Sequence, residues 1–263
     1  MADSPFKPCL LIPVYNHEHA IGPTLDQLRQ FDLPCLLIDD GSSEQCAKVL
    51  DELAAREPEW LTLVRRDRNG GKGAAVKTGL RFAAEKGFSH ALQIDADGQH
   101  DITAVNPMLA AAKREPDALI AAIPIFDETI SSLRFYGRYL THVWIWINTL
   151  SFEIRDSMCG FRVYPLPATL RELQRAPMGD RMDFDPEILV RLFWAGVHLR
   201  QLPSAVHYPL DGVSHFRGWL DNWLISRMHA RLFFGMLIRS PLLLARKFQR
   251  RMLRKDKARR SEA

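Results

Sequence analysis

The sequence predicts an α/β fold in which a mostly parallel β-sheet carries helices on both faces. Short apolar runs of strand character alternate with segments of helical period through the first half of the chain. The runs are apolar throughout, which is typical of parallel strands buried on both faces. At 263 residues, and without an internal repeat or a low-complexity linker, the chain suits one large domain or a domain with an appendage.

The expected elements follow in order along the chain. Strands are expected at residues 9–12, 35–38, 61–64, 91–94 and 118–123, with short strands near 198–202. Helices are expected at residues 20–31, 45–56, 74–86, 131–150 and 185–194. Two more helices, 219–238 and 242–255, are expected to be separated at Pro241. The aromatic segment 131–150 is either core or a surface that touches lipid, because its apolar part is too short to span a bilayer.

Charge divides the chain into two parts. The net charge is +4, but residues 239–263 hold ten Lys or Arg against Asp256 and Glu262, so this segment carries +8 and the rest carries 25 − 29 = −4. We therefore expect a globular domain over residues 1–215 and a basic, amphipathic helical tail over 216–263. The tail suits an anionic partner, with membrane lipid and RNA as candidates, and the body is not expected to bind nucleic acid.

The tail interleaves aromatic and leucine side chains with arginines, a pattern that suits helices lying in a membrane interface. The alternative is that the first helix packs on the domain and only the basic end is solvated. A spanning helix is not expected, since Arg239 interrupts the apolar run. We expect no secretory leader before the first strand, and the four cysteines lack CxxC spacing. We expect a cytoplasmic protein, peripheral on an anionic inner-membrane surface, without a nucleic-acid partner.

Polar residues and glycines gather where the first four expected strands end. Because ligands of an open parallel sheet bind outside the carboxyl ends of its strands, these residues are expected to share one site. Each group alone is typical of an ordinary turn, but four such groups at one edge of the sheet indicate a binding site. In strand order the groups contain Pro13, Tyr15 and Asn16; Asp39 and Asp40; Asn69, Lys72 and Gly73; and Asp95, Asp97 and Gln99.

The residue types at these strand ends suit a sugar nucleotide. Asp39 or Asp40 can accept hydrogen bonds from a base or ribose, and the glycines of residues 69–73 allow close approach to a ligand, with Lys72 facing an anionic one. Neither a Walker loop nor a Rossmann fingerprint is present. Asp95 and Asp97 are oxygen ligands of the kind that a hard divalent cation prefers, and Asp97 is a candidate first ligand.

Five stretches, IPVYN, LLIDDGS, NGGKGAAVKTGL, IDADGQH and DSMCGFRVY, resemble the ordered motifs of family 2 glycosyltransferases, specifically the polyprenyl-phosphate (dolichol-phosphate) mannose synthase branch. The resemblance covers roughly residues 8–195. It implies a GT-A fold, a nucleotide-diphosphate sugar donor such as a UDP- or GDP-sugar, a Mg²⁺ or Mn²⁺ ion, and inversion at the anomeric carbon.

The resemblance also implies roles for individual residues. Asp40 would hold the nucleoside, Asp95 the ribose or the metal shell, and Asp97 with Gln99 the metal. On the acceptor side the matching positions are Asp156, Gly160, Phe161 and Arg162, where Arg162 would meet a phosphate. Residues 211–217 depart from the branch, so the acceptor is expected only to be lipid-like: a polyprenyl phosphate, or a lipid hydroxyl or carboxyl. His100, His207 and His215 are weaker candidates for the metal site.

A hydroxyl acceptor needs a carboxylate base, whereas a phosphate acceptor needs none. Asp183, Asp185 and Glu187 are the candidates, although acidic residues before a helix are also ordinary N-terminal residues. Two other functions fit parts of the sequence. An apolar strand ending in Asp-x-Asp-Gly also begins haloacid-dehalogenase-type phosphatases, but Gln99 stands where Thr or Val is usual. The last alternative is a non-catalytic sugar-nucleotide-binding membrane scaffold.

Overall fold

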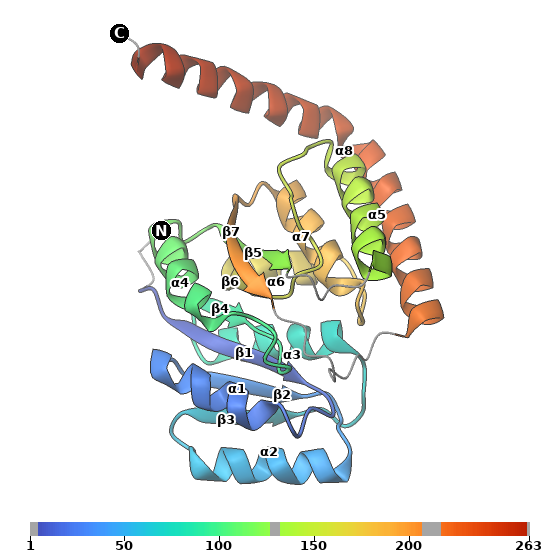
Figure 1. Ribbon diagram of the computed structural model, residues 1–263. Coiled ribbons are helices and arrows are strands. Elements are labelled where there is room, and N and C mark those ends of the chain that lie inside the picture. Colours follow the sequence, from blue (N-terminus) through green and yellow to red (C-terminus); the bar gives the residue numbers. More distant parts are fainter. Residues whose placement is uncertain (1–4, 127–131, 207–216, 262–263) are drawn as a thin grey trace.

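The computed structural model of the protein describes residues 5–126, 132–206 and 217–261 (Figure 1). It contains a seven-stranded sheet in the order β3-β2-β1-β4-β6-β5-β7. All strand pairs are parallel except the two made by β6, so β6 runs against the other six. The strands are β1 (Pro8–Val14), β2 (Cys35–Asp39), β3 (Leu61–Arg65), β4 (His90–Gln93), β5 (Leu119–Phe126), β6 (Arg162–Pro165) and β7 (Leu199–Val206). The predicted α/β class is therefore confirmed.

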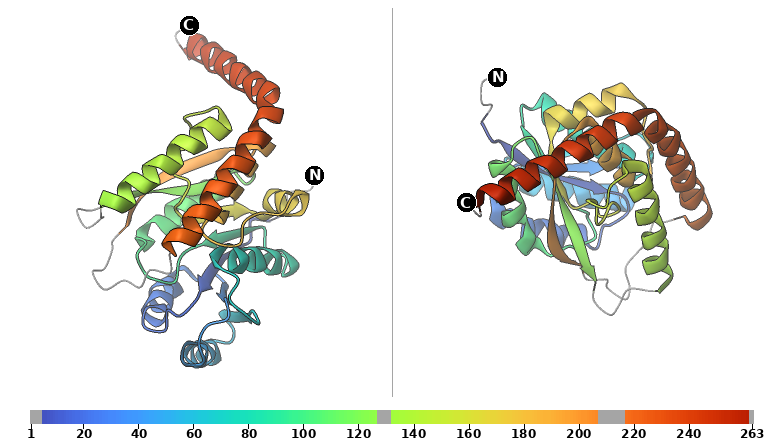
Figure 2. Two further views of the ribbon diagram at one scale, coloured as in Figure 1. Left: turned by 90° about the vertical axis from the view of Figure 1, so that its right-hand side faces the viewer. Right: turned by 90° about the horizontal axis from the view of Figure 1, so that it is seen from above.

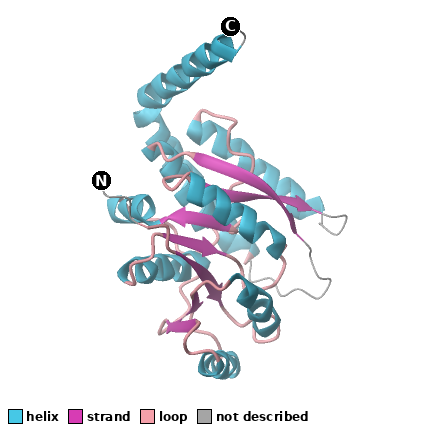
Figure 3. Ribbon diagram, turned by 90° about the vertical axis from the view of Figure 1, so that its left-hand side faces the viewer, coloured by secondary structure: helices cyan, strands magenta, loops and turns pink. Residues whose placement is uncertain are grey.

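Helices cover both faces of the sheet (Figures 1 and 3). Side chains of β1 alternate between the two cores, with Leu10 and Ile12 in one and Cys9 and Leu11 in the other. The first core is closed by α1 (Ile21–Leu28), α2 (Glu44–Arg56) and α4 (Val105–Arg114). The second is closed by α3 (Lys72–Glu85), α5 (Ser132–Thr149), α6 (Leu166–Arg175), α7 (Phe184–Ala195) and α8 (Gly218–Ser261).

Strand β6 and helices α4 and α6 were not predicted from the sequence. β6 matters for the site, because it runs antiparallel beside β4 and pairs Arg162 with Gln93. The chain just before β6, residues 156–161, consequently reaches the same edge of the sheet as the carboxyl end of β4.

The prediction of two C-terminal helices is wrong, because α8 is one helix with Pro241 inside it. Proline removes one backbone hydrogen bond and bends a helix without necessarily ending it. Figures 1 and 2 show α8 running beside α5 and then changing direction towards the C-terminus. None of the helices in the described ranges is long and apolar enough to cross a membrane. His207, His215 and the loop 211–216 lie outside the described residues.

Candidate active site at the carboxyl edge of the sheet

The order of the strands locates the site. From β1 the chain builds outward through β2 and β3, and then returns to place β4 on the other side of β1. The topological switch point therefore lies between β1 and β4, where open α/β sheets bind their ligands. Asp95 and Asp97 follow β4 at this point.

Lys72 is the centre of the site. Its Nζ lies 2.8 Å from the carboxylate of Asp95 and 3.2 Å from that of Asp185. His100 Nε2 lies 3.6 Å from Asp95. The cluster joins the first residue of α3, the end of β4 and the first turn of α7. Three elements that are distant in sequence thus bring two carboxylates to one ammonium group.

The charges in this cluster support one another. Burial alone would raise the pKa of Asp95, but the charge of Lys72 and the hydrogen bond from His100 hold it below its usual range. Burial would lower the pKa of Lys72, but Asp185 and Asp95 raise it above its usual value. Both ions therefore keep their charges at neutral pH.

Unused polar atoms surround the same cluster. Asp185 Oδ1, both side-chain polar atoms of Gln93, and His100 Nδ1 are buried and find no hydrogen-bond partner among the described residues. Buried polar groups are nearly always paired, so such atoms indicate that water or a ligand completes the site. Sequence reasoning missed Gln93. The available signal was an amide two positions before Asp95, on the same face of the strand.

Gly160 is the acceptor-motif residue that touches the cluster. A methyl group at this position would lie 2.5 Å from Lys72 Nζ and 2.6 Å from Gln93 Nε2. A larger residue would displace the ends of the Lys72 and Gln93 side chains, so glycine at this position leaves space beside the cluster.

Asp97 and its neighbours suit a divalent cation that takes most of its ligands from a bound phosphate and from water. Burial and the nearby charge of Asp95 raise the pKa of Asp97, so the two carboxylates repel each other in the absence of a cation. Asp97 Oδ1 accepts a 3.1 Å hydrogen bond from the Gln99 amide. Within the described ranges there is no group of three or more His, Cys, Asp or Glu side chains that would enclose a metal. Mg²⁺ commonly uses one or two carboxylates together with phosphate oxygens, and Asp97 fits that pattern.

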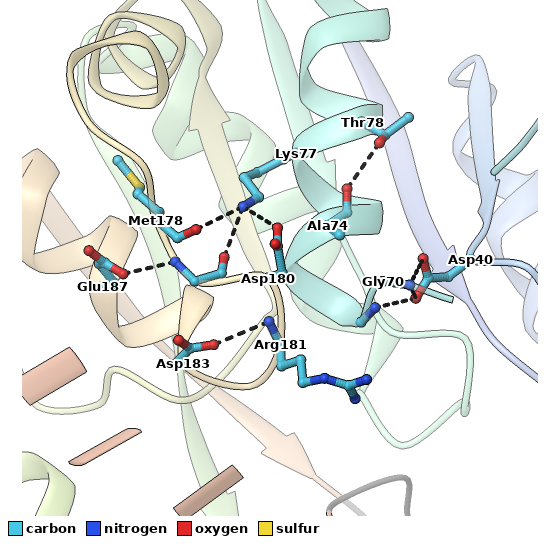
Figure 4. A network of polar contacts seen from close by, with 12 residues as sticks. Asp40, Gly70, Ala74, Lys77, Thr78, Met178, Asp180, Arg181, Asp183 and Glu187 are labelled. Carbon is cyan, nitrogen blue, oxygen red and sulfur yellow. Dashed lines mark hydrogen bonds and ion pairs between the residues drawn. The ribbon is translucent and has the colours of Figure 1, made fainter. Parts of the chain in front are cut away.

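Asp39 and Asp40 are both bonded to neighbouring residues of the chain, and the expected nucleoside contact of Asp40 stays a prediction. Asp40 is 2% exposed and pairs with Arg66, and it accepts hydrogen bonds from the amides of Gly70 and Gly71 at 3.1 and 2.7 Å (Figure 4). Asp39 is fully buried and accepts 2.9 and 2.7 Å bonds from the Ser42 amide and Arg65 Nε. In this structure the Asp40 carboxylate holds the glycine loop at the start of α3.

The glycines of that loop allow it to pack closely against the segment that precedes α7. A methyl group at Gly71 would lie 2.6 Å from Arg181 Cγ, and one at Gly73 would collide with Phe184. In this structure the backbone of residues 70–73 approaches residues 180–184 closely. Asn69, the residue before this loop, is half-buried.

The loop after β1 joins the loop after β2. Asn16, at φ 51°, accepts a 2.8 Å bond from the Ser43 amide, and its own amide donates to Ser42 Oγ. Tyr15 is half-buried beside it, whereas Pro13 is buried within the strand. Asn16 therefore fixes the position of the loop next to the switch point.

Two of the three candidate bases face away from the cluster. Glu187 is fully buried, bonds Arg191 and Arg231, and accepts a 3.0 Å bond from the Gly179 amide. Asp183 accepts a 3.1 Å bond from the Arg181 amide, and burial raises its pKa (Figure 4). Asp185 is therefore the one carboxylate of the three that contacts Lys72.

Arg162 and Asp156 are also internal. Arg162 is fully buried, and its guanidinium donates to the carbonyls of Cys159, Asp185 and Ser157 at 2.8, 2.7 and 2.6 Å. Asp156 is bridged by Arg138 Nε and Nη2 at 2.6 and 2.8 Å, which, against the effect of burial, holds its pKa below the usual range. In this structure the Arg162 guanidinium is directed at these carbonyls of the protein, and its proposed contact with an acceptor phosphate stays a prediction. Both residues position the edge of the site.

The fold is of the GT-A class, and it is similar to that of a mannosyltransferase from Pyrobaculum calidifontis solved with GDP-mannose and Mn²⁺, at a TM-score of 0.57 and 17% identity over 89% of this chain and 64% of that one. Residues 9–171 match the model of glycosyl transferase family 2, and the chain belongs to that family. The resemblance that the motifs indicated is therefore confirmed.

Curated relatives include members of the polyprenyl-phosphate branch. The polyprenol monophosphomannose synthase of Mycolicibacterium smegmatis is 24% identical over 59% of this chain and 60% of its own length. The dolichyl-phosphate β-glucosyltransferase of Dictyostelium discoideum is 26% identical over 68% of this chain and 60% of its own length. The chain thus spans less than two thirds of these relatives. Nothing in these likenesses favours the phosphatase or the scaffold alternative.

Proposed function

We propose that this protein transfers a sugar from a nucleotide-diphosphate sugar to the phosphate of a polyprenyl-type lipid, with inversion and with the help of Mg²⁺ or Mn²⁺. The observation that carries the proposal is the Lys72 cluster at the switch point, where Asp95 and Asp185 share one ammonium group. The relatives named for transfer to polyprenol and dolichyl phosphate support the acceptor class. The complex of the Pyrobaculum enzyme with GDP-mannose and Mn²⁺ supports the donor class and the ion.

The residues divide the work as follows. Asp97 and Gln99 would hold the cation, which supplies Lewis-acid stabilisation to the departing nucleoside diphosphate. Lys72 keeps a second positive charge beside that diphosphate, and Asp95 fixes Lys72 and accepts hydrogen bonds from the ribose. Asp185 faces the reacting sugar across Lys72, and its unpartnered oxygen is available to a hydroxyl or to water.

The acceptor decides whether Asp185 acts as a base. A phosphate acceptor is already ionised at neutral pH and attacks without losing a proton, whereas a lipid hydroxyl must transfer one to a carboxylate. With polyprenyl phosphate, Asp185→Asn is expected to retain a substantial part of the transfer rate. With a hydroxyl acceptor the same variant would lose about a hundredfold or more.

A donor screen tests the function. UDP- and GDP-sugars are to be compared for thermal stabilisation of the protein with Mn²⁺ and with EDTA, and for transfer to polyprenyl phosphate. We expect one donor class to stabilise the wild type only with Mn²⁺, and Asp97→Asn to abolish that effect. Asp26→Asn, an exposed position on α1, is the matched control. Binding that is indifferent to EDTA and to Asp97→Asn would refute the metal assignment, and phosphatase turnover dependent on Asp95 would refute the transferase.

A further inference from the structure

Helix α8 has two apolar faces. One packs into the second core through Ile225, Met228, Leu232, Met236 and Leu243, all nearly inaccessible to solvent. The other, here called the outer stripe, consists of Trp219, Trp223, Phe234, Leu237, Leu244 and Phe248, whose side chains are 50–95% exposed. These residues recur with the period of a helix on both sides of Pro241, so they lie on the solvent side of α8. An apolar row of this kind is unusual on a face that contacts only water.

The apolar surface continues from α8 onto α5. The Phe234 ring of the outer stripe lies 5.9 Å from Phe233, which in turn lies 6.4 Å from Trp144 of α5. Leu140, on the same helix as Trp144, is 62% exposed. Figure 2 shows the two helices side by side on the outside of the molecule, with the sheet behind them. The exposed surface is therefore a broad patch made by two helices.

The length and charge of the patch favour an extended anionic partner. From Trp219 to Phe248 the outer stripe covers roughly 40 Å of helix, at about 1.5 Å per residue. The Arg227 guanidinium lies 5.5 Å from the centre of the Trp223 ring, which places a cation beside the stripe. Residues 239–263, which include its end, carry a net +8. A second copy of the chain brings the same positive charge and is a poorer fit than anionic lipid.

We propose that the outer stripe of α8, with Leu140 and Trp144 of α5, rests on the surface of an anionic lipid bilayer. The aromatic and leucine side chains enter the boundary between headgroups and acyl chains, where tryptophan is enriched. Arg227 contacts the lipid phosphates, and the net positive charge of the sequence 239–263 adds attraction to an anionic surface. The part of α8 before Pro241 lies along the membrane plane, because its other face packs into the second core. This surface is separate from the sugar-transfer site, so either proposal can fail without the other.

Vesicle binding by the full chain tests the proposal. Phosphatidylcholine vesicles with and without one quarter phosphatidylglycerol are to be compared by co-sedimentation, and tryptophan quenching is to be measured with bromine-labelled acyl chains. We expect anionic vesicles to be bound about tenfold more tightly, with quenching. The double variant Trp223→Ser, Phe234→Ser should weaken binding at least about tenfold, because two large aromatic side chains are lost. Gln45→Ser, at an exposed position of α2 on the other face of the sheet, is the control and should bind as the wild type.

Three results would overturn the proposal: wild-type binding by the double variant, absence of quenching, or a dimer in lipid-free solution that the double variant converts to a monomer. The last result would assign the outer stripe to a second copy of the chain. An unchanged melting temperature shows that the double variant is folded. If it is not, Trp219→Ser, at a side chain 95% exposed, replaces it, and the quenching of the wild type needs no variant.

Discussion

Replacement of Lys72 by methionine tests the electrostatic account of the site directly. Asp95 and Asp185 both lie within 3.2 Å of Lys72 Nζ, so the variant leaves two carboxylates facing each other without a cation. Removing one partner of a buried ion pair costs about 3–5 kcal/mol. Because the side chains of Lys72 and Asp95 are 18% and 23% exposed, solvent screening reduces the expected loss to about 2–3 kcal/mol. With an unfolding entropy of about 2.1 cal/mol/K per residue over 263 residues, the melting temperature should fall by about 5 °C.

The pH dependence of this loss gives a second, independent check. The pKa of Asp95 is depressed in the folded protein, so its stabilising contribution is present above the unfolded value of 3.8 and is lost as the pH falls through the folded pKa. Lys72→Met removes the largest cause of that depression and leaves only the contact with His100. The difference in melting temperature should therefore be largest near pH 7 and narrow below about pH 4. Calorimetry of both proteins, with Lys48→Met at an exposed site of α2 as control, measures it. An unchanged melting temperature at pH 7, or a gap that widens on acidification, would refute the reasoning.

Two other predictions concern space and protonation. Gly160→Ala should lower the sugar-transfer rate by about tenfold or more, because the added methyl group displaces Lys72 from Asp95. Its melting temperature should fall less than that of Lys72→Met. Equal initial velocities of wild type and variant would contradict this prediction. Burial lowers the pKa of His229 to about 4, so between pH 6.5 and 4 the unfolded chain binds a proton that the folded one does not. The free energy of unfolding should therefore fall by up to about 3 kcal/mol on acidification through this range. His229→Gln should remove that part of the pH dependence, as measured by urea unfolding. If the free energies of unfolding of wild type and variant change in parallel with pH, the prediction is wrong.

Much of the fold and the place of the site could be predicted from the sequence. The buried strands are short apolar runs between helical segments, and in a parallel sheet their carboxyl ends must meet at one edge. Asp95 and Asp97 could therefore be placed at the same edge of the sheet as the ends of β1 and β2 without a structure. β6 could not, because its four residues begin with an arginine and end with a proline. Arg162 is buried there only because three backbone carbonyls surround its guanidinium.

The roles of Asp185 and Glu187 could not be predicted from the sequence, because they depend on partners that are distant along the chain. Asp185 and Glu187 are two positions apart in α7, so they point in different directions around the helix. Asp185 meets Lys72 at the start of α3, while Glu187 meets Arg231, 44 residues further along the chain. In the sequence alone, both residues are equally good candidates for the carboxylate base. Only the packing of α3 and α8 against α7 separates a carboxylate available to chemistry from one used to join helices.

The Glu187–Arg231 contact has a mechanical consequence. Arg231 lies on α8 between Trp223 and Phe234 of the outer stripe, and Glu187 lies one half-turn from Asp185. An ion pair thus joins the helix proposed to rest on lipid to α7, whose first turn carries Asp185 beside Lys72. An enzyme on a flexible tether samples many heights above a membrane. If α8 rests on the bilayer as proposed, its tilt sets the distance from the Lys72 cluster to the lipid phosphates.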